Sequence, residues 1–238
     1  MSLDTIQVID SKYDMVTELP PPSITPRPPE PPSPLPCLPP VASQVVTANP
    51  APLGLCAFAL STLVLSLHLI GAGVSLDGPQ DIVISLAMFY GGLCQILTGM
   101  WEFRTGNTFG ATTFTSYGAY WLSYGFIYLR GSNILDGYGG ETEAFNHSLG
   151  LFMTGWALFT ALMLITAHRS CITLVAQFFM LFLNYVLAAA YRFNGNASTS
   201  VASGVCGVIA ALLAFYNAVA GMLTPDNSFF VLPIGRLP

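Results

Sequence analysis

Two short stretches of this sequence could do chemistry, and each combines polar residues with glycine or proline. The first is Asn49-Pro50-Ala51-Pro52-Leu53-Gly54-Leu55. Asparagine is a good N-cap and a proline at the first helical position loses no hydrogen bond, so the stretch predicts a helix that begins at Pro50. Either this is only a rigid helix start, or the N-terminal helix dipole faces a small anion. The binding candidates in this stretch are Asn49, Pro50, Leu53 and Gly54.

The second stretch is GNTFGATTFTSYG, from Gly106 to Gly118. At helical spacing the hydroxyls at positions 108, 112, 115 and 116 share one broad face, and Thr113, Tyr117 and Tyr120 lie along a neighbouring face. Hydroxyls can line a narrow aqueous path, although in membrane helices they also bond within their own helix or to a neighbour. So many in one segment favours a pore lining, with Thr112, Thr113 and Ser116 as binding candidates.

Four other polar residues are candidates for structural roles or for carrying a proton: His68, Gln95, Glu102 and Asn107. An imidazole can exchange protons near neutral pH, but a single histidine near a helix end more often has a structural role. Glu102 and Arg104 are expected at a membrane boundary, where they pair with each other or with another helix. Amides such as that of Gln95 most often bond between helices.

The sequence contains no enzyme motif. We find no Ser-His-Asp or Cys-His arrangement, HExxH, phosphate loop or GxGxxG. The cysteines at 37, 56, 94, 171 and 206 have neither metal-ligand spacing nor the even number of a disulfide framework. We therefore predict no enzyme activity, no catalytic residues, no metal and no cofactor. A net charge of −5 with a single lysine also argues against nucleic acid as a partner.

Composition places the chain in a lipid bilayer. Of its 238 residues, 53% are hydrophobic and 8% are charged, whereas a soluble domain carries about 25% charge. Six apolar windows reach the roughly 20 residues that a membrane-spanning helix needs, and every Asp, Glu, Lys and Arg lies outside them. Backbone groups in lipid must bond within their own segment, so we predict an all-α integral membrane protein with six transmembrane helices. The windows are Leu53–Ile70, Ile82–Met100, Thr108–Leu129, Ser148–Ala167, Ile172–Tyr191 and Ser200–Met222.

The first 47 residues form a separate region because they hold most of the 18 prolines. Proline at this density prevents helix formation and favours extended, solvated chain. We expect a disordered Pro-rich cytoplasmic tail at 1–47 and a six-helix transmembrane domain at 48–238. The tail is either a docking or phosphorylation segment or a simple tether. The first ten residues lack the apolar core of a cleaved signal peptide.

The arginines predict an orientation for these helices. The even connections between windows and the C-terminus carry Arg104, Arg169 and Arg236, and the odd connections carry Arg130 and Arg192. Cytoplasmic loops are richer in Lys and Arg, so both termini are expected in the cytoplasm. The glycosylation sequons at 146–148 and 196–198 agree with this orientation, since both fall in connections that it places outside.

These same stretches resemble the acetate uptake transporter family, which comprises bacterial succinate–acetate permeases and fungal acetate and ammonia-export permeases. The resemblance rests on separated blocks that occur in the family's order and cover nearly everything from residue 49 to the C-terminus. The Pro-rich tail lies outside it, and its length looks fungal. The blocks are NPAPLGL at 49–55, FYGGLCQILTGMWEF at 89–103, GNTFGATTFTSYGAYWLS at 106–123 and AGMLTPDNSFFVLPIGRLP at 220–238.

The resemblance implies six helices per protomer and a homohexamer in which each protomer holds its own pore. It also implies that the NPAPLGL segment contributes to substrate passage and that a Phe-Tyr-Leu constriction narrows the pore. Matched motif by motif, the constriction residues are Phe58, Tyr117 and Leu183. An apolar constriction excludes hydrated ions by dewetting while it passes a small, partly desolvated acid.

We therefore expect a carrier or channel for acetate and related short-chain monocarboxylates, with proton coupling left open. It is expected in the plasma membrane or an internal membrane, with the plasma membrane preferred. One alternative is ammonia or ammonium transport, for which the aromatic faces of Phe58 and Tyr117 could supply cation–π contacts. Another is a membrane sensor that transports nothing and signals through its tail.

Overall fold

The computed structural model describes residues 47–76 and 80–237, and every regular element in this part of the chain is a helix. Of the tail predicted for residues 1–47, all but the last residue lies outside the described residues. In chain order the elements are α1 (Ala51–Leu69), α2 (Asp81–Leu86), the π-helix η1 (Ala87–Cys94), α3 (Gln95–Thr105), α4 (Thr108–Tyr128), α5 (Ile134–Gly137), α6 (Glu143–Thr166), the 3-10 helix η2 (Ala167–Arg169), α7 (Ile172–Asn194) and α8 (Ala197–Met222).

Helices α6 and α8 begin well before the apolar windows that predicted them, because polar residues cap them. Helix α6 begins at Glu143, where the Thr142 side chain accepts a hydrogen bond from the Phe145 amide at 3.3 Å. Helix α8 begins at Ala197, where the Asn196 side chain accepts from the Ser198 amide at 2.9 Å. In both cases the first turn contains polar residues, so a criterion based on an apolar run leaves it out.

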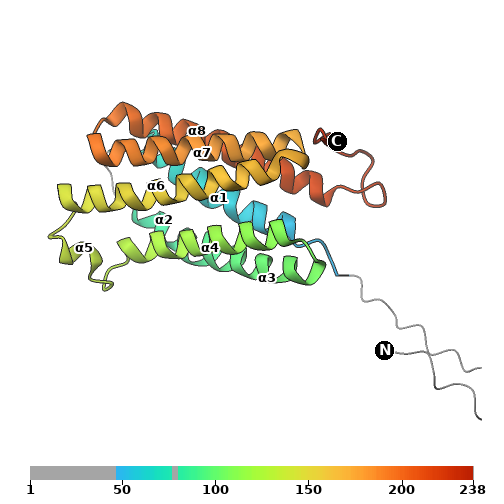
Figure 1. Cartoon of the computed structure of the whole chain (residues 1–238), viewed down its shortest axis with the longest axis horizontal. Coiled ribbons are helices and arrows are strands. Elements are labelled where there is room, and N and C mark those ends of the chain that lie inside the picture. The colour runs from blue at the N-terminus through green and yellow to red at the C-terminus, as the bar shows by residue number, and fades with distance from the viewer. Residues whose placement is uncertain (1–46, 77–79, 238) are drawn as a thin grey trace, which may run out of the picture. The chain divides into compact units, whose positions relative to one another are not determined.

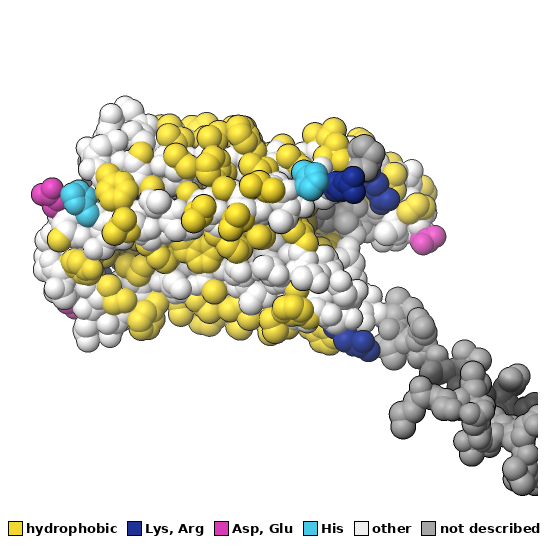
Figure 2. Space-filling view, viewed as in Figure 1, with side chains coloured by type: hydrophobic (Ala, Val, Ile, Leu, Met, Phe, Trp, Pro, Cys, Tyr) yellow, Lys and Arg dark blue, Asp and Glu magenta, His cyan; other side chains and the backbone are white. Residues whose placement is uncertain are grey.

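Within residues 47–76 and 80–237, five helical segments are long and apolar enough to cross a membrane: Ala51–Leu69, Asp81–Thr105, Glu143–Arg169, Ile172–Asn194 and Ala197–Met222. Helix α4 spans 21 residues, but its many Thr, Ser, Gly and Tyr residues make it more polar. Large apolar side chains such as Phe89 and Leu151 are exposed. In Figure 2, hydrophobic side chains run along the bundle and the charged ones gather towards its ends. The chain is therefore an integral membrane protein that crosses the bilayer several times.

The long helices form a bundle with two closely packed groups. Helix α8 packs against α1 and α7, and α7 packs against α6; separately, α4 packs against α3 and η1. Helix α1 connects the groups, since it also contacts η1 and α3. Figure 1 shows the start of α1 and the C-terminal segment at the same end of the bundle, with α5 at the opposite end. The backbone of α4 makes few close approaches to α6 and α7, and aromatic side chains fill the space between them.

Glycine allows α3 and α4 to approach closely. A Cβ atom on Gly99 would lie 2.8 Å from the backbone nitrogen of Thr115 and would also meet the Thr115 hydroxyl oxygen. Since backbone atoms cannot move aside as a side chain can, a larger residue at this position forces the two helices apart.

We predict that Gly99→Ala destabilises the protein by about 1–3 kcal/mol, the usual range for overpacking. The matched control is Gly155→Ala, because Gly155 lies within α6 and a Cβ atom there would meet nothing within 4 Å. The measurement is the midpoint of thermal unfolding of the purified protein in detergent. Equal midpoints for the two variants would contradict the close α3–α4 packing.

Candidate functional site

A cavity of about 130 Å³ lies between α1, α3, α4 and α7. Its walls are mostly apolar and aromatic, with four polar side chains. Its volume is below the roughly 300–1,000 Å³ of pockets that hold drug-sized ligands, so it suits a small solute. The lining residues are Ala51, Leu55, Phe58, Gln95, Asn107, Phe109, Gly110, Thr113, Phe114, Tyr117, Leu174, Gln177, Phe178 and Leu181.

Helical periodicity explains which faces line this cavity. On α7 the lining residues Leu174, Gln177, Phe178 and Leu181 follow the spacing i, i+3, i+4 and i+7, so they share one face. On α4 the lining residues include Thr113 and Tyr117, one turn apart. This spacing was readable in the sequence, but the apolar character of the α7 face made it indistinguishable from a lipid-facing or core-facing stripe.

A cluster of aromatic rings, here called the aromatic barrier, surrounds Tyr117 in the cavity wall. The Tyr117 ring lies 6.1 Å from Phe58, 5.5 Å from Phe159 and 6.4 Å from Phe178, measured between centroids. The Tyr117 hydroxyl lies 2.9 Å from the Thr160 hydroxyl oxygen, which itself donates to the Trp156 carbonyl. Tyr117 therefore contacts α1, α6 and α7, and its ring is held in place at both ends.

A second, smaller cavity of about 40 Å³ lies further along the same helices. Tyr120 and Tyr124 of α4 line it, as do Ala188 and Arg192 of α7. Tyr120 also packs against Tyr185, with ring centroids 5.2 Å apart. It follows Tyr117 of the larger cavity by about one helical turn, so the lining of α4 passes from one cavity to the other at these two rings. The two cavities lie on the same faces of α4 and α7, so they mark one candidate path along the bundle.

Two amides of the larger cavity differ in how far their hydrogen bonds are satisfied. The Gln177 side-chain oxygen accepts from the Asn217 amide at 2.9 Å. The side-chain oxygen of Gln95 is buried and has no hydrogen-bond partner among the described residues. The Gln95 side chain thus lines the cavity with a buried oxygen that lacks a partner, whereas Gln177 is fixed by α8.

Asn107 and Glu102 shape the corner between α3 and α4. The Asn107 side chain accepts from the Gly110 amide at 3.0 Å, which caps α4, and donates to the Glu102 carboxylate at 2.7 Å. Gly106 makes this corner possible, because its φ of 81° is in the left-handed region. The second carboxylate oxygen of Glu102 is buried without a partner among the described residues. Asn107 lines the cavity and Glu102 lies behind it.

The start of α1 differs from the prediction by one residue. The helix begins at Ala51 with Pro50 as its N-cap, and the exposed Asn49 side chain accepts from the Ala51 amide at 3.1 Å. The Leu53 amide donates to the Pro50 carbonyl at 3.2 Å, and Pro52 has no N–H. The first-turn amides are therefore occupied, which leaves only the helix dipole to act on an anion.

None of the four binding candidates in this stretch lines the cavity. The Leu53 side chain is 48% exposed. Gly54 is buried where a Cβ atom would lie 2.6 Å from the Phe114 ring, so it allows α1 and α4 to pack closely. The residues of this stretch that do line the cavity are Ala51 and Leu55.

The hydroxyls of α4 are divided between its two sides. Thr113 lines the cavity and donates to the Met163 sulfur at 3.5 Å. Thr112 is exposed and Ser116 half-buried, and neither lines the cavity. Thr115 packs against Gly99 of α3. The neighbouring face with Thr113 and Tyr117 thus meets the cavity, and the broad hydroxyl face points elsewhere.

Two other candidates lie outside the cavity. His68 is half-buried in the last turn of α1, with its Nδ1 atom 2.8 Å from the Val64 carbonyl oxygen. Leu183 is half-buried on α7 and is absent from the lining, whereas Leu181 is part of it. Two residues along a helix correspond to about 200° around its axis, so these leucines point to opposite sides of α7.

Comparison with known proteins identifies relatives over most of the chain. Ammonia transport outward protein 2 of Saccharomyces cerevisiae is 42% identical over 192 residues, which are 80% of this chain and 67% of that protein. Acetate permease A of Emericella nidulans is 42% identical over 201 residues, with the same coverage. The succinate-acetate/proton symporter SatP of Escherichia coli is 38% identical and covers 79% of this chain and 96% of its own.

A solved structure has the same fold. The structure of the bacterial acetate channel SatP superposes with a TM-score of 0.68 at 38% identity, over 80% of this chain and all of that one. The model of the GPR1/FUN34/yaaH family matches residues 36–238. The resemblance found in the sequence blocks is thereby confirmed, and the chain belongs to the GPR1/FUN34/yaaH family.

Proposed function

We propose that this protein moves acetate and related short-chain monocarboxylates across a membrane, along the path between α4 and α7. The observation that carries the proposal is the small cavity whose wall includes the Phe58–Tyr117 contact. It occurs in a chain whose relatives are named as an acetate permease and a succinate-acetate/proton symporter. The Phe58 and Tyr117 rings form the constriction, and Leu181 contributes its aliphatic wall.

The chemistry of the cavity suits a small acid. Its walls are mostly apolar, so a hydrated inorganic ion would lose its water there without compensation. A short carboxylic acid has a methyl group that packs against such walls and a polar end that can meet Gln95, Asn107 or Thr113. A multiply charged solute would find no opposite charge on the cavity wall.

We extend the proposal to six membrane crossings, with α4 as the sixth helix. The 21 residues of α4 rise about 31 Å at 1.5 Å per residue, which matches a hydrocarbon core of about 30 Å. Its hydroxyls are tolerated because neighbouring helices cover much of its surface. With six crossings both termini lie on one side, and the arginine distribution favours the cytoplasm. A homohexamer is the assembly that the family resemblance supports, and we place it in the plasma membrane.

Ammonium is the second candidate cargo. One yeast relative is named for outward ammonia transport, and the unpartnered oxygens of Gln95 and Glu102 are acceptors that suit an N–H donor. The same acceptors also suit the hydroxyl of a protonated acid, which is how a proton could travel with acetate.

We predict that Phe58→Ala relaxes size selection. In cells that lack other acetate carriers, uptake of labelled butyrate relative to acetate should rise about tenfold, since pockets discriminate a methylene by at least that factor. The control is Phe89→Ala, because the Phe89 side chain is 70% exposed on the outside of the bundle. An unchanged butyrate-to-acetate uptake ratio in Phe58→Ala would show that Phe58 is not part of the constriction. A wild type that reaches the membrane but takes up no acetate above empty cells would overturn the acetate proposal, and labelled methylammonium would then be tested.

We predict that Leu181→Ala changes the butyrate-to-acetate ratio in the same direction as Phe58→Ala, because Leu181 lines the cavity. Leu183→Ala is the matched control and should leave the ratio at the wild-type value. The reverse result would assign the constriction to Leu183, as the family resemblance implies.

A further inference from the structure

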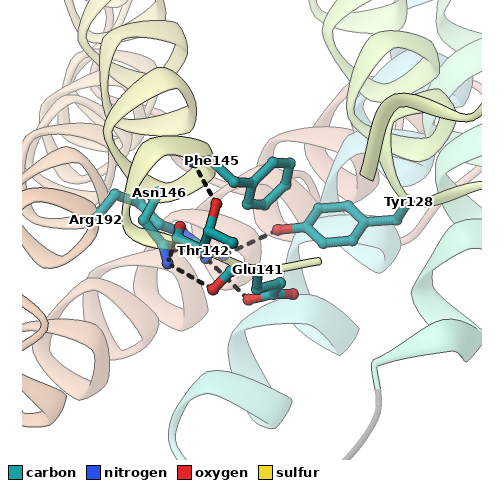
Figure 3. A network of polar contacts seen from close by, with 6 residues as sticks. All are labelled: Tyr128, Glu141, Thr142, Phe145, Asn146 and Arg192. Atoms are coloured by element: carbon teal, nitrogen blue, oxygen red, sulfur yellow. Dashed lines mark hydrogen bonds and ion pairs between the residues drawn. The ribbon is translucent and has the colours of Figure 1, made fainter. Parts of the chain in front are cut away.

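Arg192 is the only Lys or Arg that lines either of the two cavities described here. It lies in the last turn of α7, at the end of the bundle that carries α5. Its side chain is only 14% exposed, and one of its terminal nitrogens donates to the Asn146 side-chain oxygen at 2.8 Å. The other donates to the Tyr128 hydroxyl at 3.1 Å (Figure 3). A cation is thus held in a fixed position beside the path.

The neutral partners of Arg192 leave its charge poorly compensated. Asn146 and Tyr128 bind it through uncharged oxygens. The acidic partner within reach is Glu141, whose carboxylate lies 3.6 Å from the guanidinium and is 53% exposed. That separation is too long for a hydrogen bond, and an ion pair so exposed contributes little. A guanidinium has five N–H donors in a planar fork, so it retains capacity for a better placed anion.

The position of Arg192 puts these available N–H donors beside the path of a solute. Arg192 lines the smaller cavity together with Tyr120, Tyr124 and Ser203. Tyr120 lies about one helical turn along α4 from Tyr117, which lines the larger cavity. A solute that enters at the α5 end therefore meets Arg192 before the aromatic barrier. The volume of about 40 Å³ admits a group of a few atoms, such as a carboxylate, rather than a whole larger ligand.

We propose that Arg192 is a carboxylate-binding subsite at the α5 end of the path, and that Glu141 is the internal carboxylate that the substrate displaces. The inference rests on the proposed function and makes it more specific, since a guanidinium binds the anionic form of a monocarboxylate and repels ammonium. Binding here raises the local concentration of the anion at the barrier, and exchange with Glu141 keeps the subsite from holding its ligand too tightly.

The test is equilibrium exchange of labelled acetate in proteoliposomes that contain the purified full chain, a measurement that does not depend on orientation. Arg192→Gln should raise the half-saturation concentration roughly tenfold, the effect of losing one charged hydrogen bond. Its matched control is Arg130→Gln, which removes the same charge from an exposed arginine at the same end of the bundle. That control should stay within about twofold of the wild type.

The complementary variant is Glu141→Gln, which removes the competing anion and leaves the bonds of Arg192 to Asn146 and Tyr128 in place. It should lower the half-saturation concentration about two- to threefold, whereas the control Glu143→Gln should not. Because Glu141→Gln preserves the hydrogen bonds of Arg192 to Asn146 and Tyr128, it tests the subsite even if Arg192→Gln fails to fold.

Three outcomes would overturn the subsite. In the first, Arg192→Gln lowers the maximal rate with an unchanged half-saturation concentration, which indicates a structural role alone. In the second, Arg130→Gln has an equal effect, which indicates a general surface field. In the third, Glu141→Gln leaves the half-saturation concentration at the wild-type value. A wild type that exchanges no acetate at all would instead overturn the proposed function, so the two failures are distinguishable.

Discussion

The contact on which the site depends is the packing of Tyr117 between α4 and the pair α6–α7. Its ring meets Phe58 and Phe178, and its hydroxyl reaches Thr160 across the gap. Helices of a membrane protein usually approach through small residues, which would close any path between them. Large aromatic rings keep these backbones apart, and because they fill the space themselves, the gap excludes lipid and bulk water while it leaves room for a small solute.

Helix α4 combines both kinds of packing on opposite sides. Towards α3 and η1 it presents small residues, and a Cβ atom on Gly118 would lie 2.8 Å from the Gly92 carbonyl oxygen. Towards α6 and α7 it presents Thr113, Tyr117 and Tyr120. The small face fixes the position of α4 against its neighbours, and that fixed position allows the aromatic face to define the barrier. A loss of close packing at Gly99 would therefore shift α4 as a whole and displace the residues of α4 that line the path.

Sequence alone gave the membrane class, the family and most helix positions, because charge exclusion and apolar length are local properties. It could not divide the hydroxyls of α4 between its sides, since a Thr that lines a cavity and one that packs on glycine share the same pattern. Nor could the sequence show which face of α7 lines the cavity, because only the packing of neighbouring helices distinguishes the face of Leu181 from that of Leu183. The Arg192 network was also hidden, because Tyr128 and Arg192 lie far apart in the sequence.

The two ends of the path and its middle have different chemistry, and this division suits a carrier of small acids. The middle is aromatic and repels hydrated ions whatever their sign. The end near α3 and α4 has neutral amides from Gln95 and Asn107, and the α5 end has the cation of Arg192. A carboxylate is thus attracted where it is still hydrated, and the side chains that line the larger cavity, where it is partly desolvated, are uncharged. Selection by charge at the α5 end and selection by size at the aromatic barrier can then be changed independently by mutation.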